Sequence, residues 1–229
     1  MKLEFCIDGL EGMRAAAKYG ADRVELCSAL EVGGLTPKAE MVRACSQVSS
    51  IEIHTMIRNT PEGFTYSPKD IIAMKEDIKK MKEAGASGVV FGCLNPMGNI
   101  CQEHNHELIQ VSRKLGIEAT FHRAFDDCVD PLAGLESIMR LGFDRLLTSG
   151  QKDTAIKGIE LIKTLVHQAN QKIEVMAGSG VNASNASALI HTRVDALHFT
   201  IHHKNNTAPP QIDELKIRDI LKVLPHYNA

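Results

Sequence analysis

An imidazole, a guanidinium and a carboxylate follow one another in the stretch ATFHRAFD, residues 119 to 126. The stretch opens like a buried strand and then presents His122, Arg123 and Asp126. A histidine can transfer a proton near neutral pH, and an arginine can neutralise an anion. The sequence therefore predicts that this strand end meets an anion or an acidic proton.

Two further segments combine glycine with small polar residues. They are LTSGQKD, residues 147 to 153, and MAGSGVNASN, residues 176 to 185. Glycine lets the backbone approach a ligand closely, and a following helix offers unsatisfied N–H groups to an anion. The candidates for anion binding are Gly150, Gly178, Ser179 and Gly180. A tight strand-to-helix turn without a ligand is the alternative for either segment.

The elements that must position these residues alternate along the chain. Helix-like segments end at Gly20, Gly85, Gly116 and Gly142, and a short Val/Leu/Ile-rich strand follows each of them. The expected strands span 3–7, 23–27, 51–57, 88–92, 118–122, 145–149, 173–178 and 195–200, with helices in the gaps and a last helix over 213–224.

Strands that alternate with helices form a parallel sheet, and eight such units match the size of a closed barrel. We therefore predict one (β/α)8 TIM-type barrel domain over residues 1–229. The alternative is an open doubly wound sheet. Its glycine-rich turn after the first strand is missing, because IDGLEG does not follow GxGxxG.

Composition restricts the class of protein. Apolar residues make up 44% of the chain, charged residues 24%, and the formal net charge is -2, which argues against nucleic acid as the main partner. The N-terminal MKLEFCID enters an apolar alternation with no targeting pattern, and no apolar run approaches the roughly 20 residues that span a bilayer. We expect a cytoplasmic protein without a membrane partner.

Strand parity predicts which side chains point into the barrel, whose active face lies at the carboxyl ends of the strands. The polar and sulfur-bearing residues of inner parity are Glu4, Cys6, Asp8, Glu25, Cys27, Glu52, His54, Met56, Thr120, His122, Thr148, His198 and Thr200. Burying a carboxylate without a partner is costly, so Arg58 and Arg123 are the expected counter-charges. A structural ionic layer is the alternative to a reactive pocket.

Cys6 and Cys27 are expected at matching inner positions of adjacent strands. The six cysteines form no CxxC pair, and a chain of 229 residues needs no disulfide staple, so we expect reduced thiols. Two thiolates could share a soft ion such as Cu(I), which accepts a low coordination number. Small apolar fillers are the alternative role for two buried cysteines.

Several long stretches resemble the CutC copper-homeostasis family. They are LEFCID, GADRVELCSALEVGGLTP, a third strand closing on MIR and followed by FTYS, then TFHRAFD and RLLTSGQ, in the family's order over nearly the whole chain. The resemblance implies a cytoplasmic (β/α)8 barrel that self-associates, with a dimer as the expected state. It also implies copper handling and no organic cofactor.

The resemblance further implies the residues of the site. The family's two strand-end cysteines correspond to Cys6 and Cys27, as ligands of a cuprous ion. The other motif residues correspond to Glu25, His54, Arg58, His122, Arg123, Asp126, Thr148 and Ser149, of which the first six are catalytic candidates and the last two join the anion-binding candidates.

This chain departs from the family pattern in two loops. The family's RPRGGDF is here RNTPEGF, residues 58 to 64, and the stretch after the eighth expected strand reads HFTIHHKNN, residues 198 to 206. The pair His202 and His203 lies in a polar setting with Lys204, Asn205 and Asn206, which favours solvated side chains over a metal site. Ligand contacts of both loops are expected to differ from the family's.

Three hypotheses follow from these residues. The first is a copper-binding protein that holds Cu(I) through Cys6 and Cys27. The second is a metal-independent lyase or isomerase, acting on a small anionic or phosphorylated metabolite with Arg58 and Arg123 neutralising its charge and His122 or Glu25 moving a proton. The third, a purely structural interaction protein, would not need a polar barrel mouth.

Overall fold

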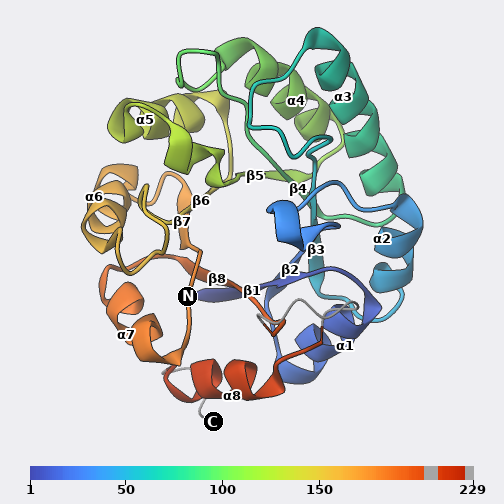
Figure 1. The fold of residues 1–229 in the computed structure, drawn as a ribbon. Coiled ribbons are helices and arrows are strands. Elements are labelled where there is room, and N and C mark those ends of the chain that lie inside the picture. Colours follow the sequence, from blue (N-terminus) through green and yellow to red (C-terminus); the bar gives the residue numbers. More distant parts are fainter. Residues whose placement is uncertain (204–210, 225–229) are drawn as a thin grey trace.

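Eight parallel strands close into a barrel in the order of the sequence (Figure 1). The structure is a computed structural model and describes residues 1–203 and 211–224. The strands are β1 (Lys2–Ile7), β2 (Arg23–Leu26), β3 (Glu52–Met56), β4 (Gly88–Phe91), β5 (Glu118–Phe121), β6 (Arg145–Thr148), β7 (Glu174–Ala177) and β8 (Ala196–Thr200). The predicted (β/α)8 barrel is confirmed.

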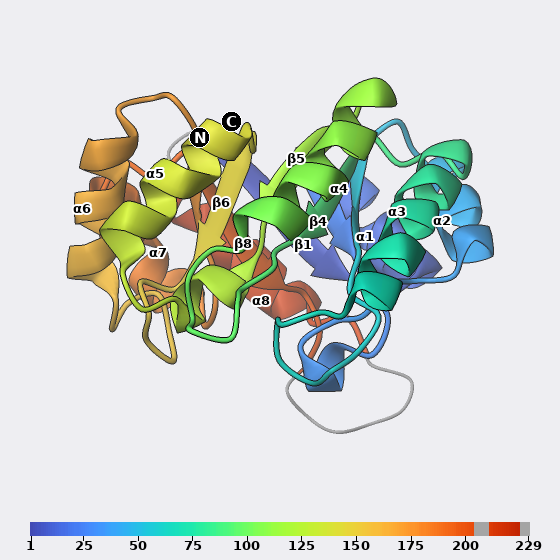
Figure 2. The ribbon, with the colours of Figure 1, turned by 90° about the horizontal axis from the view of Figure 1, so that it is seen from above.

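A helix follows each strand and covers the outside of the barrel (Figure 1). The helices are α1 (Leu10–Tyr19), α2 (Ala39–Ser46), α3 (Pro68–Glu83), α4 (Gln102–Lys114), α5 (Pro131–Leu141), α6 (Ile159–Ala169), α7 (Ala183–His191) and α8 (Glu214–Lys222), with short 3-10 helices η1 (Leu30–Val32) and η2 (Arg123–Asp127). Figure 2 shows η1, in blue, together with loops that follow the strands, at one end of the barrel. In the described chain, no helix is long and apolar enough to cross a membrane.

Local signals set the helix boundaries. Ser67 caps α3 in a reciprocal capping box with Asp70, and the Asp130 carboxylate accepts hydrogen bonds from the first turn of α5. Gly20 and Gly142 end α1 and α5 in the left-handed conformation, with φ of 71° and 88°. A side chain would strain both positions, so glycine ends the helix and lets the next strand begin.

The amino-terminal half of the barrel interior is charged. Arg23 is fully buried, and its guanidinium donates to Glu4 and to Glu174, each at 2.5 Å. Arg145 pairs with Glu118 and with Glu174. The expectation that Arg58 and Arg123 balance the buried glutamates is therefore wrong, because strand pairing places Arg23 and Arg145 beside these carboxylates.

The parity predicted for Thr148 and the burial predicted for Glu52 are also corrected. In β6 the inner residues are Arg145 and Leu147, which pair with inner residues of β5 and β7, so Thr148 lies on the outer parity. Leu occupies both 146 and 147, which hides the alternation in the sequence. Glu52 has inner parity, but it lies at the start of β3 and is exposed.

Candidate functional site

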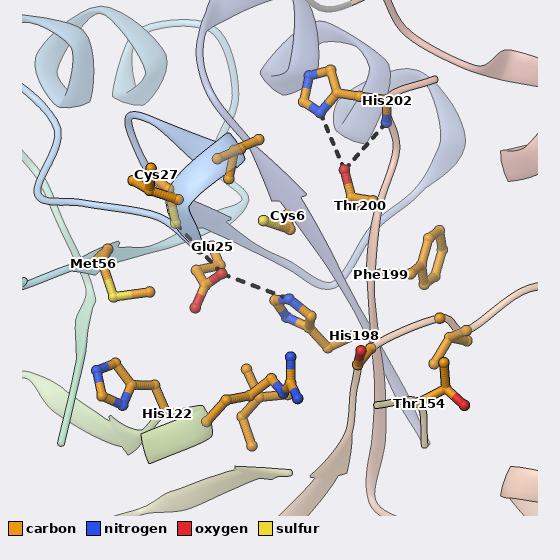
Figure 3. Close-up of a pocket in the computed structure, with 18 of the residues that line it drawn as sticks. Cys6, Glu25, Cys27, Met56, His122, Thr154, His198, Phe199, Thr200 and His202 are labelled. Carbon is orange, nitrogen blue, oxygen red and sulfur yellow. Dashed lines mark hydrogen bonds and ion pairs between the residues drawn. The ribbon is translucent and has the colours of Figure 1, made fainter. Parts of the chain in front are cut away.

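A pocket of about 820 Å³ lies at the carboxyl ends of the strands (Figure 3). Its wall combines inner strand residues, such as Cys6 and His198, with residues of the following loops, such as Arg58 and Gly180. This is the face on which TIM barrels place their active sites. The described residues thus form a cavity large enough for a small organic molecule.

One half of the pocket gathers Cys6 of β1, Glu25 of β2, Cys27 directly after β2 and His198 of β8. The ligand atoms of Cys6, Glu25 and Cys27 all lie within 4.8 Å of one another. The Cys27 thiol donates to Glu25 at 3.5 Å, and His198 Nε2 lies 3.6 Å from the same carboxylate (Figure 3). His198 Nδ1 also contacts Glu4 at 2.8 Å, which links the pocket to the charged layer below it.

These groups shift one another's protonation. Hydrogen bonding with Cys27 lowers the pKa of Cys6 well below its usual value, and the same interaction raises the pKa of Cys27. Burial raises the pKa of Glu25 to about 8, in spite of the opposing charge of His198. Burial opposes the charge of His198, but Glu25, Cys6 and Glu4 together raise its pKa well above the usual value. These shifts make Cys6 the more acidic of the two thiols.

The other half of the pocket contains Arg58, Phe64 and His122. The Arg58 guanidinium donates to the backbone carbonyls of Val32 at 2.9 Å and Gly34 at 3.1 Å, and a third bond goes to the carbonyl of residue 61. It lies 5.0 Å from the centre of the Phe64 ring, whose other neighbour is the His122 ring at 4.9 Å. Arg58 therefore anchors two loops rather than a glutamate.

His122 is a buried neutral imidazole. Burial and the nearby Arg58 charge lower its pKa to about 3. Its Nδ1 atom accepts a hydrogen bond from the backbone N–H of Ala124 at 3.2 Å, whereas its Nε2 atom has no partner among the described residues. Figure 3 shows the ring at the pocket wall opposite Glu25 and His198.

This burial should make stability depend on pH. Between about pH 6.5 and about pH 3 the unfolded chain binds a proton at His122 that the folded chain excludes, so the free energy of unfolding falls as the pH is lowered through this range. His122→Gln should reduce the slope by up to about 1.4 kcal/mol per pH unit. Urea unfolding at several pH values, followed by circular dichroism because the chain has no tryptophan, measures the slope. The exposed His106→Gln variant is the control; an unchanged slope in His122→Gln would contradict the prediction.

The Asp126 carboxylate already fills the first predicted anion-binding segment, residues 147 to 153. The carboxylate accepts hydrogen bonds from Thr148 Oγ1 at 2.5 Å, from the backbone N–H of Ser149 at 3.0 Å and from that of Gln151 at 3.2 Å. Arg123 Nε donates to it at 2.8 Å. Thr148 and Ser149 therefore bind an anion that belongs to the chain itself, and the N–H of Gly150 donates to the Thr148 hydroxyl. None of these three residues lines the pocket.

The second predicted anion-binding segment, residues 176 to 185, stays open to the pocket. Ser179 and Gly180 line the pocket, and both have positive φ, 78° and 70°. Their backbone N–H groups have no acceptor among the described residues, whereas the Ser179 hydroxyl donates to the carbonyl of Asp153. Gly178 faces the barrel interior, because a Cβ atom there would lie 2.5 Å from Leu147. Of the predicted anion-binding residues, Ser179 and Gly180 remain available.

Two histidines lie elsewhere than expected. His54 is fully buried in the charged half of the barrel, 3.5 Å from Glu118, and does not line the pocket. His202 is buried and pairs with Asp8 at 2.9 Å, so the interpretation of a solvated pair was wrong for it, whereas His203 is exposed. Residues 204 to 206 lie outside the described part of the chain.

Sequence reasoning assigned no role to His198 or Arg23. His198 had the inner parity expected of a site residue, and this signal could have found it. Arg23 shares the parity of Glu25 in the same strand. Their partners, Glu4, Glu25 and Glu174, come from three strands, so only the barrel brings these groups together.

Comparison with known proteins agrees with this architecture. The profile of the CutC family matches residues 1–203. A family protein CutC of Glaesserella parasuis is 46% identical over 201 residues, which are 87% of this chain and 82% of that protein, and one of Pasteurella multocida is 43% identical with the same coverage. A crystal structure of a CutC protein from Streptococcus agalactiae, at 32% identity, covers 87% of this chain and 98% of its own with a TM-score of 0.81. The chain belongs to the CutC family.

Proposed function

We propose that this protein binds a cuprous ion through Cys6 and Cys27, as part of copper handling. One observation carries the proposal: the two thiol sulfurs and the Glu25 carboxylate all lie within 4.8 Å of one another at the pocket wall. Two thiolates at this separation suit Cu(I), which is soft and accepts few ligands. In this proposal copper is cargo, which the pocket receives and releases.

The surroundings of the two cysteines support this role. Cys6 is 7% exposed and Cys27 is 1% exposed, and both pack with Met56 and Val90 in a small apolar cluster. Such a setting protects Cu(I) from water while the opening of the pocket gives access. The relative from Streptococcus agalactiae is itself named for copper homeostasis.

Removing either thiol should abolish tight copper binding. In an anaerobic competition titration against a chromogenic Cu(I) chelator, we expect one ion per chain for the parent protein. Cys6→Ser and Cys27→Ser should each weaken binding by at least about 100-fold, because one of two soft ligands is lost.

Cys101→Ser provides the matched control, since Cys101 lies outside the pocket at the start of α4. This variant should bind copper as the parent does. If both single variants at Cys6 and Cys27 retain the parent's affinity and stoichiometry, the copper proposal fails.

The volume of the pocket favours a second candidate function. A single ion fills a small part of about 820 Å³, and the half around Arg58 and His122 takes no part in the thiol cluster. A metal-independent lyase or isomerase that acts on a small anionic metabolite would use this room, with Arg123, Ser179 and Gly180 at the rim.

Location and assembly complete the proposal. We propose a cytoplasmic site of action, where a reducing environment would keep all six cysteines as the free thiols seen here. Self-association as a dimer stays a prediction from the family, which sedimentation equilibrium of the purified protein would test.

A further inference from the structure

We infer that the pocket contains a second subsite, formed by His122, Arg58 and Phe64, which binds the oxyanion group of a small organic molecule. This subsite lies outside the group of Cys6, Glu25 and Cys27. The inference does not depend on copper binding. It deepens the second candidate function, on which it rests for its biological meaning, by naming the ligand class.

The hydrogen bonding of His122 determines what it offers to a ligand. Its Nδ1 atom accepts from the backbone N–H of Ala124, so in the neutral ring the proton must be on Nε2. This Nε2–H group is buried and has no acceptor among the described residues. Because buried donors are almost always satisfied, an acceptor that enters the pocket is the expected partner.

Arg58 provides the positive charge. Three backbone carbonyls hold its guanidinium in place, and no carboxylate of the described residues lies within 4.0 Å of it. Arg58 is 5% exposed, so water screens the charge only weakly. Carbonyl groups orient an arginine without neutralising it, and a net positive charge therefore remains at the pocket wall.

Phe64 joins the two residues into one surface. Its ring centre lies 5.0 Å from the Arg58 guanidinium carbon and 4.9 Å from the centre of the His122 ring. The subsite thus presents a neutral N–H donor, a fixed cation and an apolar ring. An oxygen acceptor with negative charge fits this set, whereas a cationic group would meet repulsion from Arg58.

The pocket has room for the rest of such a molecule. Ser179 and Gly180 also line the pocket, and their backbone N–H groups, which have no acceptor among the described residues, could bind further oxygens. The chemistry is shared by a carboxylate and a phosphate monoester, because both present oxygens with negative charge to N–H donors. Separate probes distinguish these two sources.

Titration of copper-free protein with pyruvate and, separately, with inorganic phosphate tests the inference at constant ionic strength. Nuclear magnetic resonance of protein with ¹⁵N-labelled histidine reports on Nε2–H of His122 directly. We expect at least one probe to shift this resonance in a saturable manner. Isothermal titration calorimetry, which does not need the His122 resonance, measures affinity in the variants. His122→Phe should weaken binding of that probe at least about tenfold, because the donor is lost while an aromatic ring is kept.

Matched variants make the outcome specific. His122→Gln keeps an N–H donor and should bind within about threefold of the parent, and the exposed His106→Phe should bind as the parent does. Saturation with pyruvate alone assigns a carboxylate ligand, and saturation with phosphate alone assigns a phosphate ester.

Two results would overturn the inference. They are the absence of a saturable shift with both probes, and equal probe affinity in His122→Phe and the parent. The Cu(I) affinity of His122→Phe should equal that of the parent protein. Copper binding that fails while anion binding survives, or the reverse, therefore separates the two proposals.

Discussion

Replacement of Arg23 by methionine is expected to lower the free energy of unfolding by about 3 to 5 kcal/mol, the range found when one partner of a buried ion pair is removed. Arg23 is fully buried, and Glu4 is its partner at 2.5 Å with a side chain that is 1% exposed. Burial opposes the charge of Glu4, yet His198 and Arg23 hold the pKa of its carboxyl well below the usual range. Without Arg23 this carboxylate would stay buried with less compensation.

Urea denaturation followed by circular dichroism measures the effect of Arg23→Met. The double variant Glu4→Gln/Arg23→Met should be more stable than the single variant, because it removes the stranded charge along with the arginine. Arg14→Met, which breaks only an exposed pair with Glu11, should change the stability little. A single variant as stable as Arg14→Met would show that the charged layer does not hold the barrel together.

Replacement of Asp126 by alanine is expected to destabilise the protein by about 3 kcal/mol, since hydrogen bonds to a charged acceptor contribute about 1.5 to 3 kcal/mol each and are not additive. The carboxylate is 6% exposed and accepts from Thr148, Ser149, Gln151 and Arg123. Its loss would leave backbone donors of the β6 loop without an acceptor. Amide hydrogen exchange at Ser149 and Gln151 should accelerate, which locates the effect.

The neighbouring Asp127→Ala is the matched control for Asp126→Ala. Asp127 belongs to the same 3-10 helix and is exposed, so its removal should leave both stability and exchange in the β6 loop unchanged. Rapid exchange in both variants would mean that the loop frays for another reason. Unchanged exchange in Asp126→Ala would show that the carboxylate does not order the loop.

Arg23 and Asp126 support the same pocket from two directions. Arg23 and its partners form a charged layer beneath Glu25 and His198, through the contact of His198 with Glu4. Asp126 orders the loop beyond β6 and holds the Arg123 side chain at the pocket rim. The groups that line the pocket are thereby fixed from below and from the side, an arrangement that would suit a preorganised site.

Several features could be predicted from the sequence because they depend on neighbours in the chain. Gly20 and Gly142 end helices through their own backbone conformation, and Ser67 with Asp70 begins one. Repetition of such signals predicted eight strands and a closed barrel. The inner positions of Cys6, Glu25 and His122 followed from alternation within single strands, and all three line the pocket.

Other features depend on contacts between segments far apart in the chain. The sequence suggested Arg58 as the partner of a glutamate, but a long side chain can turn to any acceptor within reach, and here three loop carbonyls lie closer. Asp126 was a catalytic candidate, but its carboxylate accepts hydrogen bonds from the loop that follows β6. His202 pairs with Asp8, which directly follows β1 and precedes His202 by 194 residues in the sequence.

The sequence by itself determined the barrel, the direction of most strand side chains and the pair of strand-end cysteines, because alternation and capping act over a few residues. Only the tertiary structure decided which charges compensate one another and which of the two predicted anion-binding segments is filled. It also decided that His122 offers an unsatisfied N–H group. The physical reason is that ion pairs and hydrogen bonds across a barrel depend on the stagger between strands and on the paths of loops, which no short stretch of residues encodes.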